Sequence, residues 1–401
     1  MAGSIRGLLV ARLGCVSAVI VDVLRTASGR GKPGGALSAW HPAALLGTVI
    51  AELVDRAGID PALVDDVYAG CVTQVGRQSQ NVARSAALAA GLPLTVPGTT
   101  IDRQCGSSQQ AIHFAHAAVA AGLAECVVAC GVELMSTHPI GSAALGEDPI
   151  PAQVHGRFPG LTHQGVAAEL VAARHGIGRD AQDEYAARSH ARAAAVAWGD
   201  EILPVAGLSG EHIVDETIRA GTTTDRLAGL QPAFRTDELA ARHPELAWAV
   251  TAGNASPLTD GASAVLVTSE DFALRHGLRP RVRIVDSVVV GSDPVEMLSG
   301  VIPATTRILE RNRLRIEDVD LVEVNEAFAA IPLAWLAAIG GDGDRLNARG
   351  GAIALGHALG SSGTRIMTTL VHGLERGHGR LGLQTMCEGG GMANATLVER
   401  L

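Results

Sequence analysis

Two cysteines and one histidine of this 401-residue chain stand in short glycine- and serine-rich segments that could support nucleophilic chemistry. Cys105 lies in D-R-Q-C-G-S-S-Q-Q-A, between an extended T-V-P-G-T-T-I segment and an alanine-rich segment of helical period. This order places the thiol where a strand gives way to a helix. Unpaired backbone N–H groups and the positive end of the helix dipole favour a thiolate there. We therefore expect Cys105 to be an exposed nucleophile, although an arbitrary cysteine is more often a buried small hydrophobe.

The histidine and the second cysteine lie far downstream, in two further glycine-rich corners. G-G-A-I-A-L-G-H-A-L-G-S-S-G-T-R places His357 at the start of a helix, and C-E-G-G-G-M places Cys387 at a strand end. A neutral imidazole within reach of a thiol can take its proton. The bare N–H groups of the glycines after Cys387 can face a developing oxyanion. V-N-E-A-F puts Asn325 at another strand end, where its amide can hold a water or a carbonyl.

Each of these residues also has a structural interpretation. A histidine beside glycines can cap a helix, Cys387 can be a core residue, and Asn325 can be the N-cap of a helix. Four such corners in one chain, all at strand ends, favour the chemical interpretation.

The elements that must position these corners occur twice along the chain. The first half has a strand over residues 17–24, a helix over 42–57 and the segment G-I-D-P-A-L-V-D-D-V. The second half has a strand over 281–290, a helix over 303–312 and the segment L-R-I-E-D-V-D-L-V. Alternating strands and helices predict an α/β fold of two repeated, layered halves. A near-symmetric stack would bring the two equivalent corners, at Cys105 and His357, together.

The repeat is interrupted in the middle of the chain, by a segment rich in His, Pro and Gly that continues into an amphipathic helix over 181–198. We predict three parts. They are an N-terminal half formed by residues 1–134 with 252–280, an inserted loop domain over 135–251 laid on that half, and a C-terminal half over 281–401.

Composition narrows the class of protein. Hydrophobic residues make up 47%, aromatic residues only 3%, and glycine numbers 48, which is typical of a soluble α/β protein with closely packed elements. The net charge of -9, spread without blocks, argues against nucleic acid as a partner. The sequence contains no run of 18 apolar residues, so we expect no membrane-spanning helix.

The six cysteines show neither the density of a disulfide framework nor the spacing of a zinc site. A reducing compartment, the cytoplasm, is therefore expected. Cys126 and Cys130 lie in an apolar run that predicts a buried strand, and we expect them to be core residues. His113 and His116 lie one helical turn apart without a further ligand nearby, so no metal site is expected. Residues 1–21, which contain two arginines and no acid, are interpreted as an N-terminal extension leading into the first strand.

The four motifs together resemble those of the thiolase family, which comprises acetyl-CoA acetyltransferases and 3-ketoacyl-CoA thiolases. The resemblance covers residues 19–401 and includes the C-x-S, N-E-A-F, G-G-A-I-A-L-G-H and C-x-G-G-G motifs in the family's order. It implies layered α/β halves with an inserted loop domain, coenzyme A and acyl-CoA as substrates, no tightly bound cofactor, and a homodimer or homotetramer.

The resemblance also implies a role for each motif. Cys105 would carry the acyl group and His357 would activate it. Cys387 would be the acid and base that exchanges the α-proton of acetyl-CoA. Asn325 would hold a water that, with His357, polarises the thioester oxygen. The backbone N–H groups of Cys105 and Gly389 would form a second oxyanion hole.

Contacts to coenzyme A are implied on and beside the insert. Arg219 and Arg226 would lie near the nucleotide, and His163 and Ser256 along the pantetheine arm. A solvated surface arginine is the alternative for both arginines.

Four residues depart from the family pattern: Ala358 stands in place of the usual proline, Ser108 in place of a glycine, and Glu388 and Ala393 flank the second cysteine motif. A carboxylate at Glu388 would disfavour a thiolate at Cys387.

Two alternatives stay open at this point, a condensing enzyme of the ketoacyl-synthase type and a non-catalytic acyl-CoA binding protein.

The acyl pocket of such enzymes is bounded by the insert, here residues 135–161. That segment has small residues and a single aromatic, Phe158, which leaves room for a longer chain. We therefore expect thiolytic cleavage of 3-ketoacyl-CoA longer than four carbons.

Overall fold

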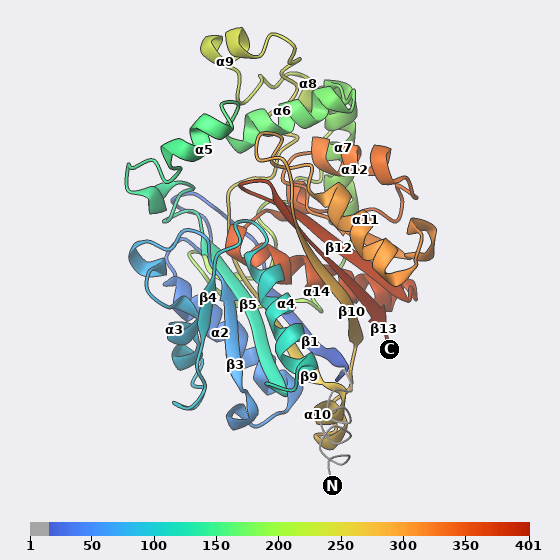
Figure 1. The fold of residues 1–401 in the computed structure, drawn as a ribbon. Helices are drawn as coiled ribbons and strands as arrows, with labels where there is room; N and C mark the ends of the chain where they lie inside the picture. The colour runs from blue at the N-terminus through green and yellow to red at the C-terminus, as the bar shows by residue number, and fades with distance from the viewer. Residues whose placement is uncertain (1–15) are drawn as a thin grey trace.

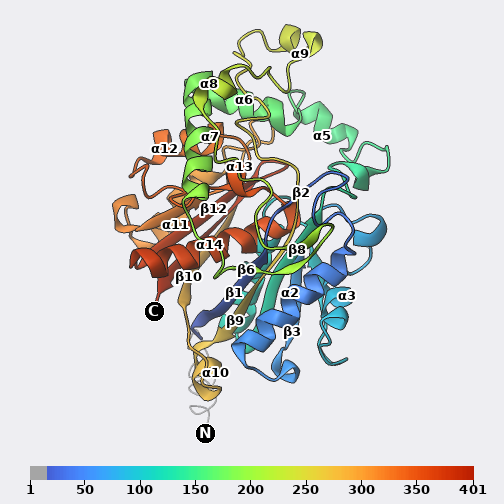
Figure 2. The ribbon, with the colours of Figure 1, turned by 180° about the vertical axis from the view of Figure 1, so that it is seen from behind.

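The computed structural model describes residues 16–401, so most of the expected N-terminal extension lies outside the described residues. Figures 1 and 2 show the chain from two opposite sides. Its strands are β1 (Ala18–Thr26), β2 (Gly29–Arg30), β3 (Asp66–Gly70), β4 (Thr99–Ile101), β5 (Cys126–Leu134), β6 (Ile202–Leu203), β7 (Val205–Gly207), β8 (Gly210–His212), β9 (Thr259–Ser269), β10 (Val282–Gly291), β11 (Leu321–Val324), β12 (Leu381–Glu388) and β13 (Met392–Arg400). Its helices are α2 (Pro42–Ala57), α3 (Val82–Ala89), α4 (Ser107–Ala120), α5 (Ala152–Arg157), α6 (Gln164–Arg174), α7 (Arg179–Ala194), α8 (Thr224–Ala228), α9 (Asp237–Arg242), α10 (Glu270–Arg275), α11 (Val301–Asn312), α12 (Ala330–Ile339), α13 (Ala352–Leu355) and α14 (Ser362–Gly377).

The same strand pairing occurs in both halves of the chain. In the first half β3 pairs parallel with β5, and β5 and β1 both pair antiparallel with β9. In the second half β11 pairs parallel with β12, and β12 and β10 both pair antiparallel with β13. The predicted internal repeat and α/β class are therefore confirmed. The halves also join edge to edge through β1 and β10, which makes one continuous sheet that the repeat alone did not predict.

The helices form layers around the two half-sheets. Helices α2 and α3 pack on the outer face of the first half, and α11 packs on the outer face of the second with α12 against it. Helices α4 and α14 lie between the half-sheets, where Ile112 and Val119 share one buried cluster with Met367 and Leu370. The helices that follow the Cys105 and His357 corners are therefore the two helices at the centre of the stack.

Local sequence explains where these elements begin and end. Helix α2 has proline at its first position and ends at Gly58, whose φ of 68° is a left-handed conformation that glycine adopts without strain. Strand β5 is buried along all nine residues, which confirms Cys126 and Cys130 as core residues.

The inserted segment packs on both halves, so the expectation that it lies on the first half is confirmed only in part. Strand β6 pairs with β1, and Val205 joins the core of the first half. Helices α6 and α7 instead pack against α12 and α13 of the second half. Ala167, Ala168 and Val171 of α6 share a buried cluster with Trp335 of α12, and this apolar contact determines the placement. The boundaries of the three predicted parts stay a prediction. Among residues 16–401 no helix is both long and apolar enough to cross a membrane.

Candidate active site

The nucleophile corner is covered by residues from distant segments. Cys105 lies two residues before α4 and packs in one cluster with Met135, Leu359 and Met386. Leu359 follows His357 by two residues and Met386 directly precedes the second cysteine, so the tertiary fold brings the three predicted corners together.

The expectation that Cys105 is exposed was wrong, because only 4% of the residue is accessible to solvent. Burial, with a smaller contribution from the nearby carboxyl of Glu388, raises the pKa of the Cys105 thiol to about 12. The backbone N–H groups of Cys105 and Gly389 act in the opposite direction, as expected at a helix start. Desolvation outweighs them, so the resting group is a thiol that needs a base.

His357 is held as a neutral base. Its Nδ1 lies 2.6 Å from Ser362 Oγ, and that hydroxyl donates its own proton to the carbonyl of Ala358 at 2.8 Å. Ser362 must therefore accept a hydrogen bond from Nδ1–H, which leaves the lone pair on Nε2. Burial lowers the pKa of His357 to about 3, with a smaller contribution from the charge of Arg365.

The backbone and neighbours of His357 fix the ring further. Its N–H donates to Thr259 Oγ1 at 2.9 Å, and its Nε2 lies 3.4 Å from Asn325 Nδ2. Among the described residues the hydrogen bonds of His357 go to Ser362, Thr259 and Asn325, and none joins it to Cys105.

Cys387 and Asn325 lie at the ends of adjacent parallel strands. Cys387 is fully buried near the end of β12, and burial raises the pKa of its thiol, with Cys105 and Glu388 raising it further. Asn325 follows β11, and its N–H donates to the carbonyl of Thr385 at 3.0 Å. Its Oδ1 is buried and has no hydrogen-bond partner within residues 16–401.

The corners border one cavity of about 670 Å³. His357, Gly389 and Gln104, the neighbour of Cys105, form its inner end. The expected acyl-pocket segment, residues 135–161, contributes only Met135 and Ile140. The other large apolar walls come from elsewhere, and sequence reasoning missed them: Phe234, Leu258, Met297, Phe328 and Leu359.

Comparison with known proteins identifies the family. A family model for the thiolase N-terminal domain matches residues 18–271, and one for the thiolase C-terminal domain matches residues 278–400. The chain belongs to the thiolase family. It is 46% identical over 397 residues to a steroid 3-ketoacyl-CoA thiolase of Mycobacterium tuberculosis, covering 96% of this chain and 94% of that protein. It is 42% identical over 396 residues to a 3-ketoacyl-CoA thiolase of Photobacterium profundum, covering 96% and 99%.

Two of the four coenzyme A contacts expected of a thiolase lie at this cavity. Ser256 and His163 line it, and the His163 ring lies 5.3 Å from that of Phe234. Arg219 and Arg226 do not line it. Arg219 borders a second cavity of about 410 Å³ that shares Leu258 with the first.

Sequence reasoning also missed Ser362 and Thr259, the two hydroxyl partners of His357 in this thiolase. The G-S-S-G segment was a usable signal, because Ser362 begins α14 directly after the His357 corner and its hydroxyl can bond back to that corner. His113 donates to or accepts from Thr396 Oγ1, in agreement with a structural role. Among the described residues no group of three potential metal ligands lies together.

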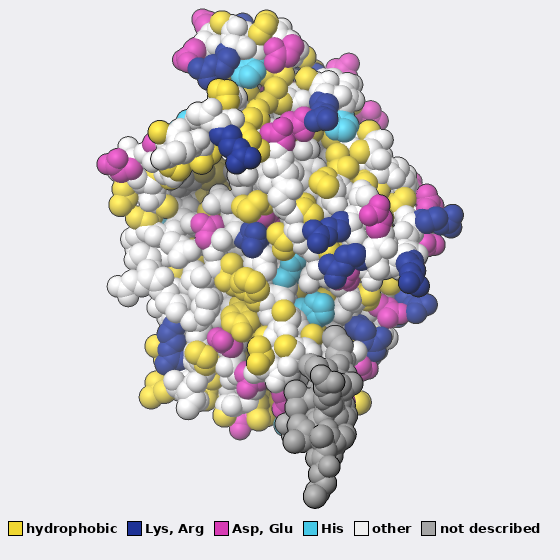
Figure 3. Space-filling model, viewed as in Figure 1, with side chains coloured by type: hydrophobic (Ala, Val, Ile, Leu, Met, Phe, Trp, Pro, Cys, Tyr) yellow, Lys and Arg dark blue, Asp and Glu magenta, His cyan; other side chains and the backbone are white. Residues whose placement is uncertain are grey.

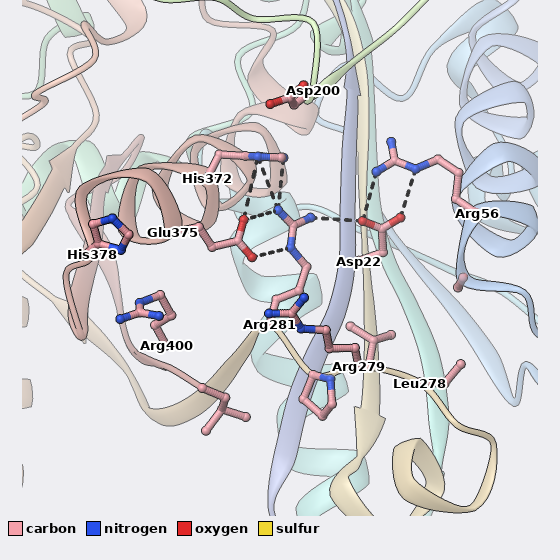
Figure 4. Close-up of a pocket in the computed structure, with 14 residues that line it drawn as sticks. Asp22, Arg56, Asp200, Leu278, Arg279, Arg281, His372, Glu375, His378 and Arg400 are labelled. Carbon is pink, nitrogen blue, oxygen red and sulfur yellow. Dashed lines mark hydrogen bonds and ion pairs between the residues drawn. The ribbon is translucent and has the colours of Figure 1, made fainter.

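A larger cavity, of about 860 Å³, lies away from the corners, beside β1, β10 and α14 (Figure 4). Arg281 projects into it between Asp22 and Glu375, at 3.0 and 2.7 Å, and Arg56 contacts Asp22 from the other side. On the surface in Figure 3, apolar side chains gather beneath α5 and α6, whereas arginines and acidic residues alternate near α11 and α12.

Proposed function

We propose that this chain transfers acyl groups through an acyl-cysteine on Cys105, with His357 as its base and Cys387 as the proton carrier. The chain is an acyltransferase of the 3-ketoacyl-CoA thiolase type, as its family and relatives show. The observation that carries the assignment of residues is the fixed tautomer of His357, which leaves Nε2 unprotonated on a residue that lines the same cavity as Gly389.

In the first half-reaction His357 takes the Cys105 proton, and the thiolate attacks the C3 carbonyl of a 3-ketoacyl-CoA. The backbone N–H groups of Cys105 and Gly389 stabilise the oxyanion. The C2–C3 bond then breaks, its electron pair goes to C2, and Cys387 donates the proton that completes acetyl-CoA. Cys105 keeps the shortened acyl group as a thioester.

In the second half-reaction Cys387, now a thiolate, takes the proton of a coenzyme A thiol. The coenzyme A sulfur attacks the acyl carbon, and Cys105 leaves as a thiolate that regains its proton from His357. Asn325 is proposed to hold a water that, with His357, polarises the thioester oxygen of acetyl-CoA. Two observations support this: its Oδ1 is buried without a partner among the described residues, and its Nδ2 lies 3.4 Å from His357 Nε2. Oδ1 can thereby orient a water.

Intact-mass spectrometry tests this division of labour. Cys387→Ala should still form an acyl-enzyme with acyl-CoA but fail in condensation, whereas Cys105→Ala should form none. An acylated Cys105→Ala protein would refute the scheme.

Iodoacetamide should label Cys105 first among the described cysteines, because the other four have no exposed surface.

The substrate is proposed to be longer than four carbons. The cavity walls are mainly apolar, and burial of each methylene contributes about 0.8 kcal/mol. One relative is named a steroid 3-ketoacyl-CoA thiolase, which agrees with a roomy pocket and a degradative role. The measurement is kcat/KM for thiolysis across a chain-length series. A maximum at acetoacetyl-CoA would contradict the proposal.

No observation favours the two alternatives, a ketoacyl-synthase-type enzyme or a non-catalytic acyl-CoA binding protein.

For Ser256 and His163 we propose contacts to pantetheine, and for Arg219 and Arg226 contacts to the nucleotide. Charge reversal at Arg219 should raise KM for coenzyme A while leaving kcat unchanged. Unchanged KM would make Arg219 a solvated surface residue.

We also propose a cytoplasmic homodimer or homotetramer. Strand β4 ends the sheet and pairs only with β3 among the described strands, which leaves one strand edge open to a second copy. Light scattering tests the assembly. A solution mass near 41.1 kDa, that of one chain, would refute it.

A further inference from the structure

Glu388 is a buried carboxyl beside the nucleophile corner that no step of the proposed reaction uses. It is the last residue of β12, lies opposite Met392 of β13, and has no exposed surface. Neither of its carboxyl oxygens has a hydrogen-bond partner within residues 16–401. A buried acid without partners is costly to ionise, so its position needs an explanation.

The carboxyl lies directly against the residue that follows Cys105. A Cβ atom added at Gly106 would be 1.9 Å from Glu388 Oε1 and 2.7 Å from its Cδ. The absence of a side chain at Gly106 therefore allows this approach. The glycine belongs to the turn that leads into α4, and its neighbour is the proposed nucleophile.

The charged groups around Glu388 do not neutralise it. The positive charge of Arg103, on the loop before α4, lowers the pKa of Glu388. The two side chains nevertheless form no ion pair within 4 Å. The Arg103 guanidinium instead contacts Met392 Sδ at 3.6 Å. Cys105 faces it from the corner, and Cys387 adjoins it on β12. Strand β13 contributes only Met392, which does not titrate.

Two other carboxyls lie near the corner, and unlike Glu388 both have hydrogen-bond partners. Asp102 is exposed and accepts a hydrogen bond from Gln104 N–H. Glu133 of β5, which also acts on Cys105, accepts from three backbone N–H groups and from Gln78. Glu388 is thus the carboxyl at this corner whose charge is uncompensated. Burial raises its pKa to about 8, with Arg103 lowering it.

We propose that Glu388 is a positioning residue for Cys105, packing against the nucleophile turn as a neutral acid and opposing the Cys105 thiolate once it loses its proton. A negative charge behind the thiol, in a poorly solvated site, disfavours a second negative charge on sulfur. The reactivity of Cys105 would then rise less steeply with pH once Glu388 is ionised.

This inference rests on the proposed function only in taking Cys105 as the nucleophile, and its test needs no turnover. The rate of Cys105 alkylation by iodoacetamide is measured by peptide mass spectrometry from pH 6.5 to 10. The proteins are wild type, Glu388→Gln, and Asp102→Asn, a control that removes an exposed carboxylate from the same loop.

Wild type and Glu388→Gln should react at rates within about twofold at pH 7, where Glu388 carries no charge. Above pH 8 the rate for Glu388→Gln should continue to rise about tenfold per pH unit, as expected for a thiol titrating well above that range. The wild-type rate should rise less steeply and be about tenfold lower at pH 10. Asp102→Asn should follow wild type.

A wild-type profile that stays straight through pH 8 would overturn the proposal, and this reading does not depend on any variant folding. A Glu388→Gln rate that differs from wild type by one constant factor at every pH would also overturn it, because that indicates a purely structural role. Full thiolysis activity after alkylation of Cys105 would instead refute the proposed function.

Discussion

The cavity bordered by the four motifs and the charged cavity beside β1 and β10 differ in how the polar groups around them are paired. The charged cavity is larger, but its groups satisfy one another, since Arg281 contacts both Asp22 and Glu375. At the four motifs, Asn325 Oδ1 and both oxygens of Glu388 lack partners among the described residues. Burial lowers the pKa of a histidine to about 3 in both places, at His357 and at His372 of the charged cavity, so displaced pKa values do not separate the two. The difference teaches that the volume of a cavity alone does not indicate where the chemistry lies, and that the polar groups around the cavity must be compared as well.

The largest effect expected from this contrast concerns His357. His357→Ala should lower kcat/KM for thiolysis about 10³-fold, because it removes the base proposed for Cys105. Arg281→Gln, in the charged cavity, should leave kcat/KM within twofold. Steady-state thiolysis of one 3-ketoacyl-CoA measures both. Equal losses in the two variants would erase the distinction between the cavities.

The second effect concerns stability and pH at Glu388. Its pKa is about 8 in the folded protein, against 4.5 for an ordinary glutamate, so the folded state keeps a proton that the unfolded state has lost between these values. The wild-type contribution therefore becomes less favourable as pH rises through this window. Glu388→Gln should be more stable than wild type by on the order of 3 kcal/mol at pH 7 and by nearly nothing at pH 4.5.

Urea unfolding of both proteins at the two pH values measures the difference. The stability gain of Glu388→Gln should grow with pH. A gain that is equal at both values would mean that Glu388 is not neutral in the folded protein.

The third effect tests whether the charged cavity is structural. Arg281→Gln should lower the free energy of unfolding by about 2 kcal/mol, because it leaves Glu375 without its partner and Asp22 with only Arg56. Arg279→Gln is the matched control, since that arginine is exposed at the same cavity and should change stability by less than about 0.5 kcal/mol. Equal changes in the two variants would contradict the importance of the pairing.

The smallest effect concerns the hydroxyl that fixes the His357 tautomer. Ser362→Ala should lower kcat about tenfold, whereas Ser362→Thr, which keeps the hydroxyl, should retain most of the activity. Thermal unfolding of both variants controls for structural damage. If alanine and threonine have the same kcat, the hydrogen bond at Nδ1 does not position the base.

The sequence by itself determined the repeated elements and the identity of the chemical corners. Helix α2 was predicted over 42–57, its observed bounds, because a proline at its start and a glycine after its end are local signals. Helix α7, which lacks such signals, ends four residues before the predicted 198. The motifs around Cys105, His357, Cys387 and Asn325 also identified the family that the comparisons then showed.

Only the tertiary structure decided how those corners are surrounded. Cys105 is buried because Met135 and Leu359, from distant segments, close over its turn. Glu388 presses on Gly106 because β12 ends beneath the start of α4. Apolar periodicity reports whether a side chain is buried, but which segments meet depends on the packing of the two halves and of the insert between them. The electrostatics of the site depend on those contacts. The sequence therefore predicted a thiolate, whereas in the fold burial favours a thiol at Cys105 and a neutral imidazole at His357.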